Sequence, residues 1–230
     1  CLSGDDHAEA IVFRGEDKAH QRLTRGELRR QVARVQAFLR DHGVGRGDRV
    51  AVMLPNMPET IVVCMATAAL GAIFSSCSPD FGVRGVLDRF GQIAPKVFVA
   101  CDGYWYNGKP VDVSGRVADV TAELRPAAAI VVPYLDDIRA RDLADRLPEG
   151  VTFEALIRSR TEMEPVYEPV AFNDPLFILY SSGTTGVPKC IVHGAGGTLL
   201  QHVKEHRYHS EIRPGDRAFY FTTCGWMMWN

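Results

Sequence analysis

The sequence is poor in lysine and has no apolar run long enough to span a membrane. Only five of its 26 basic residues are lysines, and the formal net charge is −2. No strong positive field therefore favours nucleic acid or an anionic membrane surface as a partner. The longest apolar stretch, 61–74, is shorter than the ~20 residues that cross a bilayer. The composition indicates a globular protein whose partners are neither nucleic acid nor membrane.

Cysteine pairs and a secretory leader are also missing. The six cysteines lie far apart and form no C-x-x-C pair, which is typical of reduced thiols in a cytosolic protein. No basic stretch followed by an apolar segment opens the chain, so the sequence predicts a cytoplasmic location. Cys1 stands first, and Asn230 directly follows an apolar aromatic stretch. We therefore interpret the sequence as a fragment and expect weak stability or association through truncated edges.

Helical and apolar patterns alternate along the chain. Thr24 and Glu27 form a capping box, and Asn56 and Glu59 suggest a second one. The spacing predicts helices over 25–42, 58–70, 83–91, 114–124 and 196–209, and strands over 49–54, 72–76, 96–100, 128–133, 177–180, 190–193 and 218–223. Because the strands are apolar without period-two alternation, they predict a layered α/β fold of mostly parallel sheets with helices on both faces.

One segment interrupts this alternation. Residues 161–175 contain several prolines and acidic residues and predict a linker or surface meander. The segment would separate a first α/β subdomain, 1–160, from the start of a second, 176–230. The second subdomain would carry the most informative motif of the chain.

That motif is a loop rich in serine, threonine and glycine, SSGTTGVPK at 181–189. Such a loop supplies backbone N–H groups and hydroxyls that can converge on phosphate oxygens, and Lys189 adds a mobile positive charge. It is not a Walker loop, because Lys189 does not directly follow the second glycine and leads into a strand. The position after a buried strand favours a phosphate-binding loop over a solvated turn.

The sequence YSSGTTGVPK resembles the phosphate-loop signature of the adenylate-forming superfamily. The stretches SSCSPDFGVRGVLDRFGQI, CDGYWYNGK, KCIVHGAGGTLLQHVKEH and FYFTTCGWMMWN are similar to the acetoacetyl-CoA synthetase family within it. The resemblance implies a partial N-terminal domain of an adenylate-forming enzyme, without its C-terminal domain. It also implies an ATP-dependent acid–thiol ligase that converts a short-chain acid, acetoacetate, to an acyl-adenylate and transfers the acyl group to CoA.

The resemblance further implies roles for particular residues. The β- and γ-phosphates of ATP would be held by Ser181, Ser182, Gly183, Thr184, Thr185, Gly186 and Lys189. The acyl pocket would include Trp226, Met227 and Met228, for which packing in a core is an equally open alternative. The family's magnesium-coordinating glutamate and catalytic lysine belong to segments outside this sequence. The sequence therefore assigns no catalytic residue, and Lys189 is not the family's catalytic lysine. We expect residues 1–230 alone to be inactive. The complete enzyme would use ATP, Mg²⁺ and CoA.

On the CoA side of the site the resemblance is looser. It points to Phe81 against the CoA adenine and to Arg84 or Lys109 at its phosphates, although Phe81 is more typical of a core residue. We do not count these residues among the predicted site residues.

Two other functions compete with the ligase. The chain could be a non-catalytic nucleotide-binding module. Alternatively, His202, Glu205 and His206 match the H-x-x-E-H pattern of inverted zinc peptidases. A catalytic zinc needs a third protein ligand, and few acidic residues follow His206. Leu199, Leu200 and Val203 instead predict an amphipathic helix with these side chains directed inward. We therefore expect no metal site.

Overall fold

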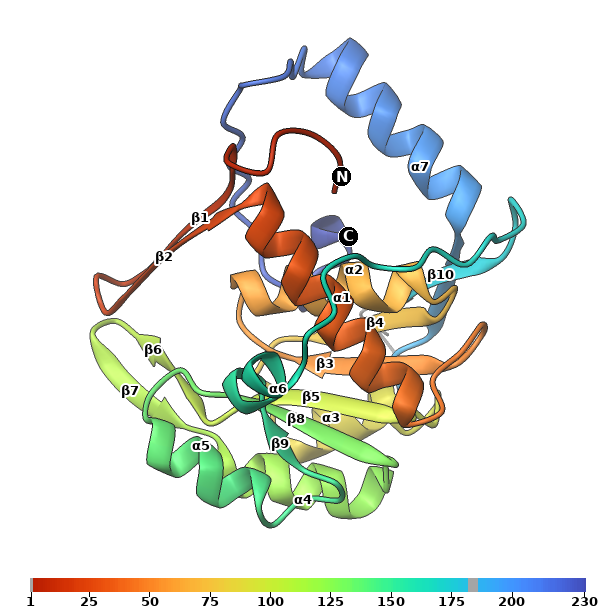
Figure 1. The fold of residues 1–230 in the computed structure, drawn as a ribbon. Helices are drawn as coiled ribbons and strands as arrows, with labels where there is room; N and C mark the ends of the chain where they lie inside the picture. Colours follow the sequence, from red (N-terminus) through yellow and green to blue (C-terminus); the bar gives the residue numbers. More distant parts are fainter. Residues whose placement is uncertain (1, 182–185) are drawn as a thin grey trace.

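The computed structural model describes residues 2–181 and 186–230, and its central element is a twisted sheet (Figure 1). Within these residues the sheet has seven strands in the order β11-β10-β4-β3-β5-β8-β9. Their bounds are β3 (Arg49–Met53), β4 (Ile73–Cys77), β5 (Val97–Cys101), β8 (Ala128–Val132), β9 (Val151–Thr152), β10 (Pro175–Tyr180) and β11 (Cys190–Gly194). All neighbouring pairs are parallel except β10 and β11.

Helices cover both faces of this sheet. On one face α1 (Arg25–Asp41) contacts α2 (Pro58–Ala69) and α6 (Phe153–Ser159). On the other, α4 (Ser114–Leu124) contacts α3 (Val83–Phe90) and α5 (Asp137–Ala144), as Figure 1 shows. The predicted α/β fold, with a mostly parallel sheet between helical layers, is confirmed.

The central strands carry the core because most of their residues are apolar and nearly all are buried. Every residue of β4, β5 and β8 is buried, and so is every residue of β3 after its first. The ring of Phe98 on β5 meets Phe90 of α3 edge-on, with centroids 6.1 Å apart. Burying a side chain of this size contributes about 1.5–3 kcal/mol. This core holds the carboxyl ends of the strands in place.

Two hairpins were not predicted from the sequence. The first pairs β1 (Glu9–Gly15) with β2 (Ala19–Thr24), and the second pairs β6 (Gly103–Tyr106) with β7 (Lys109–Asp112). The second occupies the stretch CDGYWYNGK, which we expected to be a loop. The tips of the two hairpins touch, because the Glu16 carboxylate accepts hydrogen bonds from the N–H groups of Asn107 and Gly108 at 2.9 and 2.7 Å.

Of the two predicted capping boxes, one is confirmed and one is wrong. Thr24 Oγ1 accepts from the Glu27 N–H at 3.2 Å, and the Glu27 carboxylate accepts from the Thr24 N–H at 2.8 Å. Helix α2 instead has Met57 at its N-cap and no side-chain cap. Asn56 lies one residue too early, and its Oδ1 accepts a hydrogen bond from the indole N–H of Trp229 at 3.0 Å.

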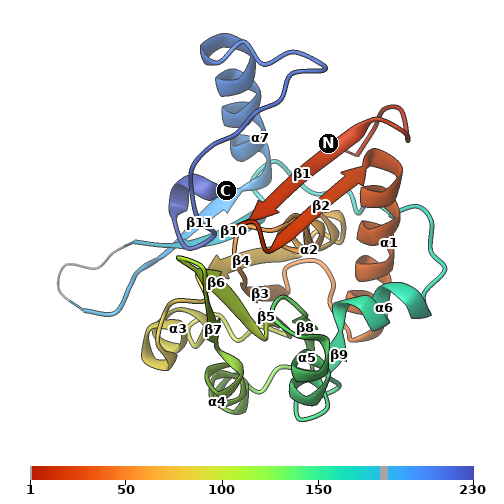
Figure 2. The same cartoon turned by 90° about the vertical axis from the view of Figure 1, so that its left-hand side faces the viewer.

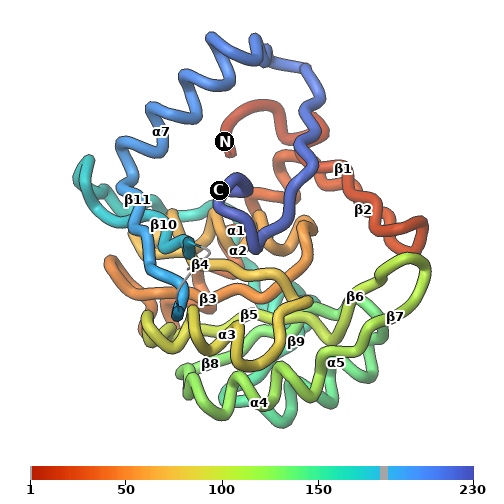
Figure 3. Tube along the Cα trace, turned by 180° about the vertical axis from the view of Figure 1, so that it is seen from behind, coloured from red at the N-terminus to blue at the C-terminus, as the bar shows by residue number. Residues whose placement is uncertain are grey.

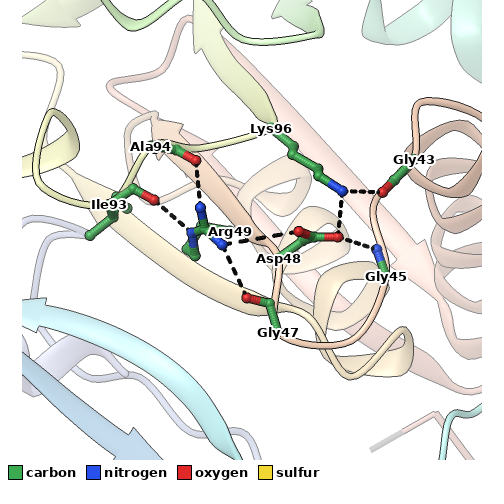
Figure 4. Close-up of polar contacts among 8 residues, drawn as sticks. All are labelled: Gly43, Gly45, Gly47, Asp48, Arg49, Ile93, Ala94 and Lys96. Atoms are coloured by element: carbon green, nitrogen blue, oxygen red, sulfur yellow. Dashed lines mark hydrogen bonds and ion pairs between the residues drawn. The ribbon is translucent and has the colours of Figure 1, made fainter.

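The turn that enters β3 is held by charged groups at the amino ends of the strands (Figure 4). The Asp48 carboxylate accepts from the Gly45 N–H at 2.9 Å and from Lys96 Nζ at 2.8 Å. Burial alone would raise the pKa of Asp48, but these two donors outweigh it and the pKa is lowered. Arg49 donates from Nε to the carbonyl of Ile93 at 2.6 Å. Lys96 and Arg49 thus have structural roles.

An irregular segment, residues 160–174, crosses from the end of α6 to β10; we call it the strap. Gln36 of α1 exchanges hydrogen bonds with the main chain of Val166 in both directions, and the Glu168 N–H donates to the carbonyl of Ala69 at 2.8 Å. The strap contains most of the predicted linker, 161–175, whose last residue begins β10. Strand β10, which follows the strap, joins the same sheet as the earlier strands. The division into two subdomains stays a prediction.

The last part of the chain is the least covered. Helix α7 (Ala195–Lys204) continues into a π-helical turn (Glu205–His209) and has no buried residue; Figure 2 shows it standing away from the layers. The inward orientation predicted for Leu199, Leu200 and Val203 is wrong, since they are 64%, 62% and 43% exposed.

The strand predicted over 218–223 is also wrong. This segment is irregular, and Phe219 and Phe221 are exposed, because no neighbouring strand among the described residues pairs with it. In the described part of the chain, no helix combines the length and apolar character that a membrane span requires.

Candidate functional site

The candidate phosphate loop connects β10 to β11 at one end of the sheet. Residues 182–185, which include Ser182, Gly183, Thr184 and Thr185, lie outside the described residues. The two ends of the loop are paired: the Ser181 N–H donates to the carbonyl of Lys189 at 3.1 Å, and Tyr180 lies opposite Cys190 in the ladder. Figure 3 shows β11 alongside β10 at the edge of the sheet.

The chemistry of the described loop residues suits an anionic ligand. Gly186 is exposed at a φ of +154°, with open space where a Cβ would lie. The Lys189 side chain is exposed, and no carboxylate in the described ranges lies within 4.0 Å of its ammonium group. Because β10 is parallel to β4, the loop begins at the carboxyl end of the sheet, the end at which open α/β sheets bind ligands.

Tyr180 anchors the start of the loop in the core. Its hydroxyl lies 2.9 Å from Ser75 Oγ, which also donates to the carbonyl of Ile178 at 2.8 Å. Its ring meets Phe90 edge-on at 6.2 Å between centroids. Burial raises the pKa of Tyr180 far above its ordinary value, so the phenol stays protonated and acts as an anchor rather than as an acid.

Helix α3 supports both ends of the loop. The Arg89 guanidinium carbon lies 4.4 Å from the ring centroid of Phe81 and 5.9 Å from that of Tyr180. Just beyond the helix, Gln92 Nε2 donates to the carbonyl of Pro188 at 2.8 Å. Neither Arg89 nor Gln92 was predicted from the sequence. Their partners in the loop, Tyr180 and Pro188, lie about ninety positions away along the chain and become neighbours only on folding.

The predicted acyl-pocket residues differ in their surroundings. Met227 packs against the core, whereas Trp226 and Met228 are 56% and 68% exposed. The segment is fixed at Cys224, whose carbonyl accepts from Ser76 Oγ at 2.8 Å. Burial raises the pKa of the Cys224 thiol to about 12, so it remains protonated. Trp229, which was not predicted, stacks on Phe74 with centroids 6.0 Å apart.

The three residues suggested for CoA lie near α3 and β7. Phe81 is partly buried, packs against the core and also faces Arg89, which agrees with the expected core role. Arg84 is exposed on α3 and pairs with Asp88 at 3.1 Å. Lys109 is exposed at the start of β7. All three are therefore on or near the surface.

The histidine motif of α7 does not assemble a metal cage. The rings of His202 and His206 stack with centroids 6.1 Å apart, but the Glu205 carboxylate is engaged by Lys204 and Gln201, both at 2.9 Å. Over 2–181 and 186–230, no group of three or more histidine, cysteine or acidic side chains is arranged to hold a metal ion. The zinc hydrolase is thus not favoured.

Comparison with known proteins identifies the family. The profile described as AMP-binding enzyme matches residues 3–229, which is nearly the whole chain. The chain belongs to the AMP-binding enzyme family. The chain is 60% identical to the acetoacetyl-coenzyme A synthetase of Rhizobium meliloti (strain 1021) over 96% of its own length and 34% of the relative's. It is 45% identical to the acetoacetyl-CoA synthetase of Danio rerio, over 91% of the chain and 32% of that protein.

A solved structure agrees with these relatives. The acetoacetyl-CoA synthetase from Streptomyces lividans superimposes with a TM-score of 0.87 at 45% identity, over 96% of this chain and 33% of that structure's chain. The described chain therefore spans about a third of the length of the relatives it matches. The predicted family is confirmed, whereas the roles of individual site residues stay predictions.

Proposed function

We propose that this chain forms the ATP-phosphate-binding part of an acetoacetate–CoA ligase. The observation that carries the proposal is the 60% identity to an acetoacetyl-coenzyme A synthetase over 96% of the chain. In the first step an acetoacetate carboxylate oxygen attacks the α-phosphorus of ATP, and pyrophosphate leaves. In the second step the sulfur of CoA attacks the acyl carbon, the acyl–phosphate bond breaks, and AMP leaves.

The phosphate loop would stabilise the leaving pyrophosphate through charge and hydrogen bonds. The assigned residues are Ser181, Ser182, Gly183, Thr184, Thr185, Gly186 and Lys189. The Ser181 N–H is already bonded to the Lys189 carbonyl, so Ser181 would contribute its hydroxyl. Lys189 would contribute its ammonium group, which has no carboxylate partner in the described ranges.

Mg²⁺ would enter this site together with ATP. Proteins commonly hold Mg²⁺ through one or two carboxylates and the substrate phosphates rather than in a protein cage. The loop would therefore meet the magnesium complex of ATP, and Lys189 would neutralise phosphate charge that the metal ion leaves.

The segment from Trp226 to Met228 would form part of the acyl pocket. Met227 packs against the core next to Trp229, so its side chain could close the pocket at a short chain length. Trp226 and Met228 are available to contact the acid, since both are exposed. We also place the protein in the cytoplasm, because its described cysteines Cys64, Cys77, Cys101, Cys190 and Cys224 are all free thiols.

Exchange of labelled pyrophosphate into ATP by the purified full-length protein tests the proposal. The assay would compare acetoacetate with acetate, propionate and butyrate, and the Lys189→Ala variant would serve as the loop control. We expect exchange to be fastest with acetoacetate and to require Lys189. ATP binding without exchange for any acid would refute the ligase and leave a nucleotide-binding module.

A further inference from the structure

Helix α3 lies beside the phosphate loop and contacts it at both ends. Arg89, near the carboxyl end of the helix, faces Tyr180, the residue directly before the loop. Gln92, just beyond the helix, reaches Pro188 near the end of the loop. Helix α3 and the residue just beyond it thus contact Tyr180, directly before the predicted phosphate-binding segment, and Pro188, near the end of that segment.

Arg89 is held by rings and main chain rather than by a counter-ion. Its guanidinium is partly buried with Phe81 and Tyr180 within cation–π distance, and its Nη1 donates to the carbonyl of Gly85 at 2.7 Å. No carboxylate in the described chain lies within 4.0 Å of it. A partly buried cation interacts more strongly with aromatic faces than a fully exposed one does. Arg89 therefore restrains the Tyr180 ring.

Gln92 makes a two-point bridge. Its Nε2 donates to the carbonyl of Asp88 at 2.6 Å and to the carbonyl of Pro188 at 2.8 Å. The first bond fixes the amide on the helix end, and the second ties the loop to it. Pro188 has no N–H of its own, so this carbonyl is its only main-chain hydrogen-bonding group.

We propose that Arg89 and Gln92 are positioning residues, here called the α3 clamp, that hold the two ends of the phosphate loop at the spacing needed to bind ATP. The identity of the ligand rests on the proposed function, whereas the restraint on the loop ends does not. A loop whose ends are fixed before binding loses less conformational freedom when its hydroxyl and N–H groups gather around phosphates. The clamp thus acts on ATP affinity through Tyr180 and Pro188, without contacting ATP itself.

Kinetics of the full-length protein provide the first test. The variants are Arg89→Gln and Gln92→Leu, with Arg141→Gln as the matched control, since Arg141 is an exposed arginine on another helix, α5. We expect Arg89→Gln and Gln92→Leu to raise the KM for ATP about five- to tenfold. The KM for the acid and the melting temperature should stay near those of Arg141→Gln. Arg89→Lys, which keeps a cation at the rings, should recover most of the loss.

Limited trypsin digestion is a second readout that does not depend on the ligase reaction. Lys189 is exposed, and the bond to Cys190 lies where the loop enters β11. Loosening the loop ends should speed cleavage of that bond about fivefold in Arg89→Gln and Gln92→Leu relative to Arg141→Gln. Mass spectrometry of the fragments would measure it.

The two readouts separate failure of the clamp from failure of the proposed function. If the wild-type protein shows no exchange, the proposed function falls, and cleavage after Lys189 alone decides the clamp. Cleavage rates equal to those of Arg141→Gln would overturn the clamp. A KM for ATP within about twofold of the control would overturn it as well, because the cation–π and amide contacts are expected to exceed that factor. Loss in Arg89→Lys equal to that in Arg89→Gln would overturn the cation–π role of Arg89.

Discussion

Asp102 offers the sharpest test of the scaffold beneath the site. Its side chain is fully buried at the end of β5, and its carboxylate accepts hydrogen bonds from the N–H groups of Tyr134, Leu135 and Asp136 at 2.8–3.2 Å. Burial raises the pKa of Asp102, although these bonds oppose the rise. The carboxylate joins β5 to the segment that follows β8, and it directly precedes the second hairpin.

The expected effect of Asp102→Ala follows from these bonds. Asp136 is exposed, so its N–H regains water, whereas Tyr134 and Leu135 are only partly exposed. Each buried N–H left unpaired costs about 1–3 kcal/mol. Two such losses, offset in part by removal of a buried charge, should lower the free energy of unfolding by about 2–4 kcal/mol. For a chain of this length, that corresponds to a fall in melting temperature of about 5–15 °C.

Urea denaturation followed by tryptophan fluorescence, with calorimetry in parallel, would measure this loss. Asp119→Ala is the control, since Asp119 is exposed on α4. Its stability should stay within about 0.5 kcal/mol of wild type. If Asp102→Ala lost less than about 1 kcal/mol, the carboxylate would not be the acceptor that holds these N–H groups, and the reasoning would be refuted.

Three further predictions concern a buried acid and the site. Glu59 has an unpartnered buried Oε2, and burial raises its pKa, so its ionised form disfavours the folded state. Glu59→Gln should therefore raise the free energy of unfolding by about 1–2 kcal/mol near pH 7. This gain should vanish as the pH falls through the raised pKa to below the ordinary value of 4.5. Urea unfolding at both pH values, with Glu123→Gln as the control, measures the gain, and an equal gain at both pH values would contradict the idea. Thr184→Ala in the full-length protein should raise the KM for ATP, and unchanged exchange kinetics would remove Thr184 from the phosphate site. Met227→Ala should extend the range of acids accepted beyond butyrate in the same assay, and an identical chain-length preference would remove Met227 from the pocket wall.

The parallel core could be predicted because its strands do not alternate between apolar and polar residues. The strands β4, β5 and β8 are buried throughout, and only helices on both faces can produce that pattern in a parallel sheet. The strand at 190–193 was predicted, but its antiparallel pairing with β10 was not, although a signal for it existed. Only nine residues, 181–189, separate β11 from β10, fewer than a parallel crossover requires. The short connection, rather than the apolar pattern, therefore requires β11 to run antiparallel to β10.

The second hairpin also had a signal in the sequence. Asn107 and Gly108 have φ values of +51° and +74°, as expected of the Asn-Gly pair in a tight hairpin turn. The residues of the α3 clamp had none, because nothing local relates Arg89 to Tyr180. The strand predicted over 218–223 was wrong because the prediction depended on local residue types alone. Aromatic residues favour a strand only where a neighbouring strand pairs with it.

The strap is the covalent connection between strands at opposite margins of the sheet. The chain leaves β9 at one margin and rejoins at β10, beside the strand at the other, after passing over α1 and α2. A nick within it would therefore yield two polypeptides whose strands still lie side by side through the contact of β10 with β4. The phosphate loop would lie on the smaller fragment. We therefore expect this fragment, produced separately, to associate with the larger one.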